Sequence, residues 1–387
     1  MPSNLPPIFG AARDAANYLK PGTCFERWSR SSSISGKSAF RSGALCYHGQ
    51  VLRNCLAGAL ALTLCGCATK QNLSRFEYTQ PQMGLPFRIV LYATDKSSAD
   101  AAATASFARI KQLNDILSDY DTDSELSRLS QTAGQGKAVP VGNDLWRMLE
   151  RSQRLARETH GAFDITCGPV VSLWRKARRE KMLPDPAKLE EARRAVGYEK
   201  LRLNSRDRTA ELLVPYMRLD LGALAKPYAV DEALNVLRLH GIRSALVTGA
   251  GDMAASAAPP GTTGWRIELA PLDATNAPAP AFVSLRHASL ATSGDVFQHV
   301  EINGVRYSHI VDPRTGLGLT DHSLVVVIAK NCETANSVST SASVLGPEAG
   351  LKFAEARGAC ARIVRKPAGQ IEVSESKCFR KWMARVP

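Results

Sequence analysis

The chain has 387 residues, of which 44% are hydrophobic and 22% charged, an ordinary globular composition that predicts a well-buried core. The formal net charge of +13 is compatible with a nucleic-acid partner, but no dense Lys/Arg run with interleaved aromatic residues lies after residue 67. We therefore expect no nucleic-acid binding, and only a mild attraction to anionic ligands or membrane surfaces.

Residues 51–67 have the features of a bacterial signal peptide. A basic residue precedes an apolar run that is too short to span a bilayer as a helix. The ending Leu64-Cys65-Gly66-Cys67 resembles the lipobox of bacterial lipoproteins, in which the last cysteine receives lipid and becomes the mature N-terminus. This resemblance predicts lipidation of Cys67 and an anchor on the periplasmic side of a membrane. A buried core helix is the weaker alternative.

The rest of the chain divides around that signal. Residues 1–50 are rich in Ser, Arg, Gly and Pro without sustained hydrophobic periodicity, which indicates a disordered extension or a mis-called translation start. Residues 68–80 are expected to form a polar tether, and residues 81–387 a folded domain.

Helices and hairpins alternate irregularly along the mature chain. Helical periodicity predicts helices at residues 98–118 and 143–161, short exposed helices at 174–197, a helix from near Pro227 to Gly241, and a long helix over 334–358. Strands are expected at 87–94, at 244–256 around a glycine turn, at 283–294, at 299–312 with a hairpin turn at Asn303-Gly304, and at 324–331. This order favours an α+β fold over a doubly wound sheet.

Two segments carry candidate binding groups. Lys226 is expected at the start of a helix, where free N–H groups and the positive dipole end attract phosphate, although an ordinary strand–helix connection explains the pattern as well. Asn336 and Thr340 lie four residues apart, so a helix places both side-chain oxygens on one face. Such oxygens can help to bind Mg²⁺, but a carboxylate is the stronger ligand and a polar helix face is the simpler interpretation.

His309 lies in the segment YSHIVDPRTG, three residues before the turn signal Asp312-Pro313. Taken locally, the histidine is either a structural residue before a turn or a titrating group beside a binding pocket. The sequence near it does not decide between these roles.

Of the four cysteines after residue 67, no pair has zinc-ligand spacing. Cys360 and Cys378 flank an expected C-terminal hairpin and could form a disulfide in an oxidising compartment. A hairpin register centred on Pro367-Ala368 does not place them opposite each other, so the pairing stays open.

The motifs together resemble the FAD:protein FMN transferase (ApbE) family, many of whose members are lipoproteins. The resemblance starts at Met83-Gly84 and continues, in the family's order, through SDYDTDSELSRL, GAFDITCGPVVSLW, LDLGALAKPYAVD, GAGD, ATSGD, HIVDPRTG and TANSVSTS. It implies an α+β fold of mixed antiparallel sheets with flanking helices, with FAD in a cleft between the sub-structures.

The resemblance also implies an enzyme that transfers FMN from FAD to a Ser or Thr hydroxyl of an acceptor flavoprotein, with Mg²⁺ required and AMP released. The acceptor is expected to be a subunit of a membrane redox complex. His309 matches the general base. The residues matching FAD contacts are Met83, Tyr120, Ala162, Phe163, Asp164, Asp220, Lys226 and Ile310, and those matching metal ligands are Ala223 through its carbonyl, Asn336, Thr340 and Ser339.

Three positions depart from the family pattern. Asn336 replaces the metal-binding Asp, Lys226-Pro227 replaces Lys-Gly, and Gly249-Ala250-Gly251-Asp252 replaces Gly-Gly-Asp. Because neutral oxygens hold a hard dication less well, we predict that Asn336→Asp raises the Mg²⁺ affinity. An FAD pyrophosphatase and a non-catalytic FAD-binding lipoprotein are the alternative functions.

Overall fold

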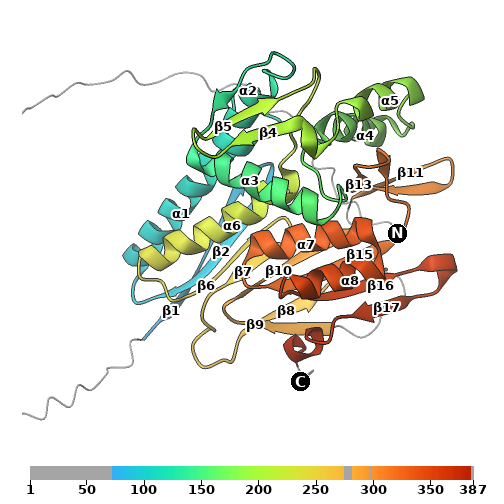
Figure 1. The fold of residues 1–387 in the computed structure, drawn as a ribbon. Helices are drawn as coiled ribbons and strands as arrows, with labels where there is room; N and C mark the ends of the chain where they lie inside the picture. Colours follow the sequence, from blue (N-terminus) through green and yellow to red (C-terminus); the bar gives the residue numbers. More distant parts are fainter. Residues whose placement is uncertain (1–71, 274–280, 297, 385–387) are drawn as a thin grey trace, which may run out of the picture. The chain divides into compact units, whose positions relative to one another are not determined.

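An eight-stranded antiparallel sheet forms the centre of the fold in the computed structural model, which describes residues 72–273, 281–296 and 298–384 (Figure 1). The lipidation site expected at Cys67, the signal peptide and residues 1–50 lie outside the described residues. In sheet order, the strands are β1 (Ser74–Gln82), β2 (Leu85–Ala93), β6 (Ser244–Gly249), β7 (Asp252–Ala255), β10 (Ala288–Gly294), β15 (Ser323–Ala329), β16 (Cys360–Arg365) and β17 (Glu372–Glu375).

The first strand begins inside the segment expected to be a tether. From Ser74 onward the chain pairs with β2, and the pairing runs as far as Gln82 opposite Leu85. Phe76 and Tyr78 pack against the buried core, whereas Glu77 between them faces outward. This alternation makes the segment an edge strand, so the tether expected at 68–80 is wrong from Ser74 onward.

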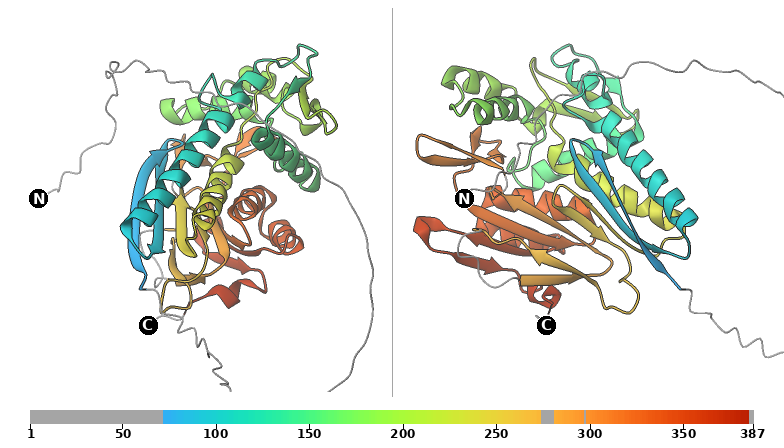
Figure 2. Two further views of the ribbon diagram at one scale, coloured as in Figure 1. Left: turned by 90° about the vertical axis from the view of Figure 1, so that its left-hand side faces the viewer. Right: turned by 180° about the vertical axis from the view of Figure 1, so that it is seen from behind.

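Helices cover one face of the sheet, as the views in Figures 1 and 2 show. They are α1 (Lys96–Leu117), α6 (Gly222–Leu239), α7 (Cys332–Leu345) and α8 (Pro347–Ala356). Phe87, Ile89 and Leu91 of β2 pack into the same buried cluster as residues of α1 and α6. Val90 lies on the opposite face, in the cluster formed with β8 (Trp265–Leu269), β9 (Ala281–Leu285) and the turn η3 (Phe379–Trp382).

A smaller substructure is inserted between α1 and α6. Its helices are α2 (Glu125–Ser130), α3 (Asn143–Glu158), α4 (Gly168–Glu180) and α5 (Pro186–Arg194), with a short 3-10 turn, η1 (Tyr198–Lys200). A three-stranded sheet joins them, in the order β3 (Val139–Pro140), β5 (Thr209–Leu212) and β4 (Leu201–Asn204). The segment expected as short exposed helices is α4 and α5, although Trp174 of α4 is fully buried.

A hairpin follows β10 and leads to the segment that contains His309. Its strands are β11 (His299–Ile302) and β12 (Val305–Ser308), and the turn between them has positive φ at Asn303 and Gly304, as expected for Asn-Gly. The short pair β13 (Val311–Asp312) and β14 (Leu317–Gly318) then leads to β15. The predicted α+β fold of antiparallel sheets with flanking helices is confirmed.

Two helix predictions need correction. Helix α6 begins at Gly222, five residues before Pro227, because Leu224, Ala225 and Tyr228 are buried and hold that first turn in the core. The helix expected over 334–358 is two helices, α7 and α8, since Gly346 adopts φ of 80° and Pro347 starts the next helix.

Cys360 and Cys378 form a disulfide, with their Cα atoms 5.4 Å apart. Strand β17 ends at Glu375, opposite Arg362. Cys378 lies in the turn beyond it, so the pairing does not require the two cysteines to be opposite each other in the hairpin.

Candidate active site

The segments singled out in the sequence gather at one end of the eight-stranded sheet. Phe87 near the start of β2 pairs with Gly249 at the end of β6, and Leu290 of β10 pairs with Met253 of β7. The β1–β2 turn at Met83-Gly84, the β6–β7 turn and the end of β10 therefore lie at the same end of the sheet. Helix α7 reaches the same end through Asn336, whose amide donates to Asp252 at the start of β7.

His309 follows β12, and its backbone N–H and ring Nδ1 both contact the carbonyl of Gln298. Its backbone N–H donates to the Gln298 carbonyl at 3.0 Å, and ring Nδ1 lies 3.1 Å from the same oxygen. Because a carbonyl only accepts, Nδ1 carries the proton and Nε2 has a free lone pair. Burial lowers the pKa of His309 to about 4, the Gln298 carbonyl opposes this, and the charges of Arg178 and Lys226 add to the lowering. The imidazole is therefore neutral near pH 7.

Cationic groups near His309 lack enough protein anions to balance them. Within the described residues, Arg178 makes no hydrogen bond or ion pair, and its Nη1 is buried without a partner. The Lys226 ammonium donates to the Gly222 carbonyl at 2.9 Å and forms no ion pair in that part of the chain. Burial and the neighbouring Arg175 lower the pKa of Arg178. Such a guanidinium favours the binding of an anion.

Asp220 and Tyr120, which matched FAD contacts, are connected through Arg175. The Asp220 carboxylate accepts from the Gly222 N–H at 2.7 Å and from Arg175 at 2.8 Å. Arg175 also pairs with Asp119, and its guanidinium carbon lies 4.3 Å from the centre of the Tyr120 ring. Burial and the nearby Asp220 charge raise the pKa of Asp119, which Arg175 opposes. Tyr120 itself is 75% exposed, so its ring is available to a ligand.

The first turns of α6 present an uncompensated backbone carbonyl. In an α-helix the Ala223 carbonyl accepts from the N–H of residue 227, but Pro227 has no N–H. The departure from Lys-Gly to Lys226-Pro227 therefore leaves the Ala223 oxygen without its helical donor. A carbonyl of this kind fits a hard cation, in agreement with the match of Ala223 to a metal ligand.

Three residues on α7 that matched metal ligands present oxygen atoms close to one another. Asn336 Oδ1 lies 3.2 Å from the Thr340 hydroxyl, which donates to it. Ser339 is fully buried, and its hydroxyl bonds to the Asn336 carbonyl at 3.0 Å and to Ser293 at 2.7 Å, so protein groups already satisfy it. Asn336, Thr340 and the Ala223 carbonyl are the oxygens best suited to Mg²⁺. Among the described ranges, no three His, Cys, Asp or Glu side chains are grouped so that they could hold a metal ion.

A carboxylate that did not enter the sequence prediction lies directly behind Asn336. Asp252 follows the β6–β7 turn, is 2% exposed, and accepts from the Asn336 amide at 2.7 Å. Burial raises the pKa of Asp252 to about 7, which the Asn336 amide and the Lys226 charge oppose. The amide N–H group is thus held toward Asp252, which turns the Asn336 oxygen toward Thr340.

The remaining residues matched to FAD contacts lie on loops around these groups. Ala162, Phe163 and Asp164 are buried in the loop between α3 and α4, and Asp164 accepts from the Thr166 N–H at 2.8 Å. Burial raises the pKa of Asp164. Ile310 is buried next to His309, and Met83 is half-buried in the β1–β2 turn. A cavity of about 320 Å³ lies beside this loop, lined among others by Gly161, Asp164 and Arg314.

Several residues of the site were not predicted from the sequence. Arg175 and Arg178 belong to a basic segment that has the composition of an exposed helix, and no local pattern distinguishes them. Asp252 and Asp295 stand at the ends of GAGD and ATSGD, and an acid directly after a glycine was the signal that the sequence offered.

Comparison with known proteins agrees with this arrangement. The model of the ApbE family matches residues 83–364. The FAD:protein FMN transferase of Haemophilus influenzae is 28% identical over 340 residues, which cover 86% of this chain and 98% of the relative. The FAD:protein FMN transferase of Treponema pallidum is 30% identical over 309 residues, covering 75% of this chain and 85% of the relative.

Solved structures show the same fold. The flavin transferase ApbE from Vibrio cholerae has a TM-score of 0.73 and 27% identity, with 80% of this chain and 99% of that chain covered. The apo form of the flavinyl transferase ApbE from Pseudomonas stutzeri has a TM-score of 0.71 and 29% identity, with 81% and 98% covered. The family match over most of the chain, together with the shared fold, shows that the chain belongs to the ApbE family.

Proposed function

We propose that the protein is an FAD:protein FMN transferase that uses Mg²⁺, transfers FMN to a Ser or Thr hydroxyl of an acceptor flavoprotein, and releases AMP. The names of its relatives support transfer of FMN from FAD to protein. The observation that carries the finer proposal is the state of His309. One ring nitrogen is tied to the Gln298 carbonyl and the other is free to take a proton, beside two unbalanced cationic groups.

The reaction is a substitution at the phosphorus of the FMN half of FAD. The acceptor hydroxyl oxygen forms a bond to that phosphorus, while the bond from the phosphorus to the bridging oxygen of the pyrophosphate breaks. AMP leaves with the bridging oxygen and its electron pair, and the hydroxyl proton passes to Nε2 of His309. One P–O bond is made and one broken, so no oxidant or reductant is needed.

A pKa of about 4 makes His309 a weak base before substrate binds. The pyrophosphate supplies negative charge opposite Arg178 and Lys226, the two cations that lower this pKa. Binding of FAD therefore raises the basicity of His309 in the step where a base is needed. The same cations balance charge on the transferred phosphoryl group and on AMP.

The residues present fit a magnesium ion. Asn336, Thr340 and the Ala223 carbonyl would hold it together with the substrate phosphates, where it would withdraw charge from the pyrophosphate. Asp252 keeps the Asn336 amide oriented, as an outer residue commonly does for a metal ligand.

We also propose that the protein works on the periplasmic side of a bacterial membrane, attached through lipid on Cys67, and that its acceptor is a subunit of a membrane redox complex. The lipobox-like ending at Cys67 supports the anchor. No helix among the described residues is long and apolar enough to cross a membrane. Mass spectrometry of the mature N-terminal peptide tests the anchor, since an unmodified Cys67 peptide would contradict it.

The transfer reaction is tested with purified protein, FAD, Mg²⁺ and a redox-complex subunit that has a Ser or Thr flavinylation site. Covalent flavin fluorescence of the subunit in a denaturing gel, with AMP formed in equal amount, supports the proposal. Free FMN without labelled subunit indicates a pyrophosphatase, and intact bound FAD indicates a carrier. His309→Gln is expected to lower the labelling rate about 1,000-fold, to a residual rate that long incubations still measure. His240→Gln, at the exposed end of α6, is the matched control.

A further inference from the structure

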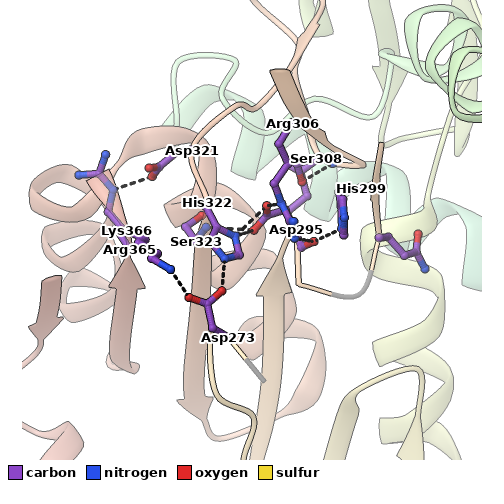
Figure 3. Close-up of polar contacts among 12 residues, drawn as sticks. Asp273, Asp295, His299, Arg306, Ser308, Asp321, His322, Ser323, Arg365 and Lys366 are labelled. Atoms are coloured by element: carbon purple, nitrogen blue, oxygen red, sulfur yellow. Dashed lines mark hydrogen bonds and ion pairs between the residues drawn. The ribbon is translucent and has the colours of Figure 1, made fainter. Parts of the chain in front are cut away.

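Asp295 holds a cluster of polar side chains at the end of β10, shown in Figure 3. The residue is 2% exposed, and its carboxylate accepts from the Ser323 N–H at 3.0 Å and lies 2.9 Å from His322 Nδ1. The same carboxylate pairs with Arg306 of β12. One buried acid therefore joins the end of β10 to the start of β15 and to the hairpin.

The backbone of Asp295 contacts the hairpin as well. Its carbonyl lies 2.8 Å from His299 Nδ1 of β11 and 3.0 Å from Arg306 Nη2 of β12. Both strands of the hairpin are thus fixed to a single residue. Arg306 meets that residue twice, through different nitrogens, which restricts the orientation of β12 more than one bond can.

The opposite side of the cluster is fixed to the central sheet. His322 lies between Asp295 and Asp273, with Nε2 at 2.9 Å from the second carboxylate. Asp273 in turn accepts from Lys366 at 2.6 Å, just beyond β16. The hairpin is therefore attached to the start of β15 through Ser323 and His322, and through the loop residue Asp273 to Lys366 beyond β16 (Figure 3).

The residues that connect Asp295 with the hairpin lie close to His309, either in the sequence or by a hydrogen bond. Arg306 precedes His309 by three residues, and Gln298, whose carbonyl takes both His309 N–H groups, follows Asp295 by three residues. Asp295 thus controls both the strand that carries His309 and the carbonyl that selects its tautomer. We propose that Asp295, with Arg306, is the positioning residue of the catalytic histidine, an inference that rests on the proposed function.

This role differs from a general contribution to stability. A displaced hairpin would move His309 Nε2 away from the acceptor hydroxyl, and a misplacement of about 1 Å can lower a rate about 100-fold. Asp220 and Lys226, which matched FAD contacts at the start of α6, bond to Arg175, Gly222 and its carbonyl and not to the cluster. Of the matched residues, Ile310 lies nearest the hairpin, with its N–H donating to Ser308. Loss of Asp295 should therefore lower kcat while leaving FAD affinity nearly unchanged.

The test compares Asp295→Asn with Asp321→Asn. Asp321 forms a neighbouring ion pair with Arg365 at 2.5 Å and does not contact the hairpin, so it controls for the loss of one acidic side chain in the same region. Hydrogen exchange of peptides over residues 299–310 gives a readout that needs no activity. Exchange is expected to rise about tenfold or more in Asp295→Asn and to stay unchanged in Asp321→Asn.

Kinetics supply the second readout. With Asp295→Asn we expect kcat for FMN transfer to fall about 100-fold, and the FAD dissociation constant from flavin fluorescence to stay within about threefold. In a His309→Gln background, Asp295→Asn should cause no further loss, because there is no base left to position. Arg306→Lys should recover part of the rate lost in Arg306→Gln, because the lysine keeps the charge.

The possible results distinguish a failure of the positioning role of Asp295 from a failure of the proposed function. Unchanged hairpin exchange in Asp295→Asn overturns the positioning role, and so does an equal loss of rate in the His309→Gln background. A loss explained entirely by weaker FAD binding overturns it as well. If the wild-type protein labels no acceptor yet Asp295→Asn loosens the hairpin, the proposed function fails while the structural link from Asp295 to His309 stands.

Discussion

Asn336→Asp would place a second carboxylate against Asp252. In the wild-type protein the Asn336 amide donates to Asp252 at 2.7 Å. An aspartate at that position can keep a hydrogen bond only if one of the two acids holds a proton. The substitution thus adds a full negative charge once both acids are ionised. Without metal, however, the pair of acids holds a proton, which Mg²⁺ must displace on binding.

The size of the effect follows from the proton count. In the wild-type protein the raised pKa of Asp252, about 7, means that the folded state keeps a proton which the unfolded chain has lost. This stabilising contribution is present at low pH and disappears as the pH rises to about 7, above which Asp252 adds no pH dependence. In Asn336→Asp the pair keeps one proton above pH 7. The free energy of unfolding should then keep falling by about 1.4 kcal/mol per pH unit, or about 2 kcal/mol between pH 7 and 8.5.

Urea unfolding at pH 6.5, 7.5 and 8.5 measures this slope, and calorimetry with FAD present measures Mg²⁺ binding. We expect the variant to bind Mg²⁺ about tenfold more tightly than wild type at pH 8.5, with a smaller gain at pH 6.5, because protons compete there. Titrations in two buffers of different ionisation enthalpy should show about one proton released per ion in the variant. Asn143→Asp, where the new charge meets Arg208, is the matched control.

Two results would refute this reasoning. A stability difference that does not change with pH would show that the two acids do not share a proton. Equal Mg²⁺ binding by both forms with FAD present would show that the charge at position 336 does not limit metal affinity.

Three further changes test other parts of the structure. Pro227→Ala restores an N–H donor to the Ala223 carbonyl, so it should raise the free energy of unfolding, measured in urea melts, by about 1–3 kcal/mol. The same change should weaken Mg²⁺ binding severalfold in calorimetry, and an unchanged Mg²⁺ affinity would contradict a role for that carbonyl. Arg178→Gln should weaken FAD binding about tenfold without affecting riboflavin, as measured by fluorescence quenching, and an equal loss for both would place Arg178 away from the phosphates. Cys360→Ser opens a disulfide between residues 18 positions apart and should lower the free energy of unfolding in urea melts by about 3 kcal/mol. An unchanged free energy of unfolding would show that the disulfide does not form in solution.

Features set by neighbouring residues could be predicted from the sequence. The hairpin turn at Asn303-Gly304 needs two positive φ angles, 53° and 75°, which these residue types adopt readily. The strand expected to run on to Asp312 ends instead at Ser308, and Val311–Asp312 form the separate short strand β13. The start of α6 was missed because Pro227 usually marks the first turn of a helix, whereas here burial of the preceding turn in the core outweighs that preference.

Contacts between distant residues could not be predicted in this way. Arg175 pairs with Asp119 and Asp220, which are 56 and 45 residues away, and Asp295 meets His322 across 27 residues. Periodicity describes which face of a helix is buried, but it does not say which charged residue of another element will oppose it. His309 could be proposed as the general base from its motif, whereas the contacts of Asp295 with the hairpin before it were visible only in the fold.

The departures from the family pattern acquire a common explanation once they are placed in the structure. Pro227 removes the helical donor of the Ala223 carbonyl, which makes that oxygen a better ligand. Asn336 lacks a charge, yet its amide is held 2.7 Å from Asp252, at the end of the altered glycine turn. Asp252, which corresponds to the Asp of the family's Gly-Gly-Asp, therefore keeps an acidic group directly behind the Asn336 amide. A neutral amide beside Asp252 avoids two acids competing for one proton, so the exchange of Asp for Asn is compatible with a site that still binds a cation.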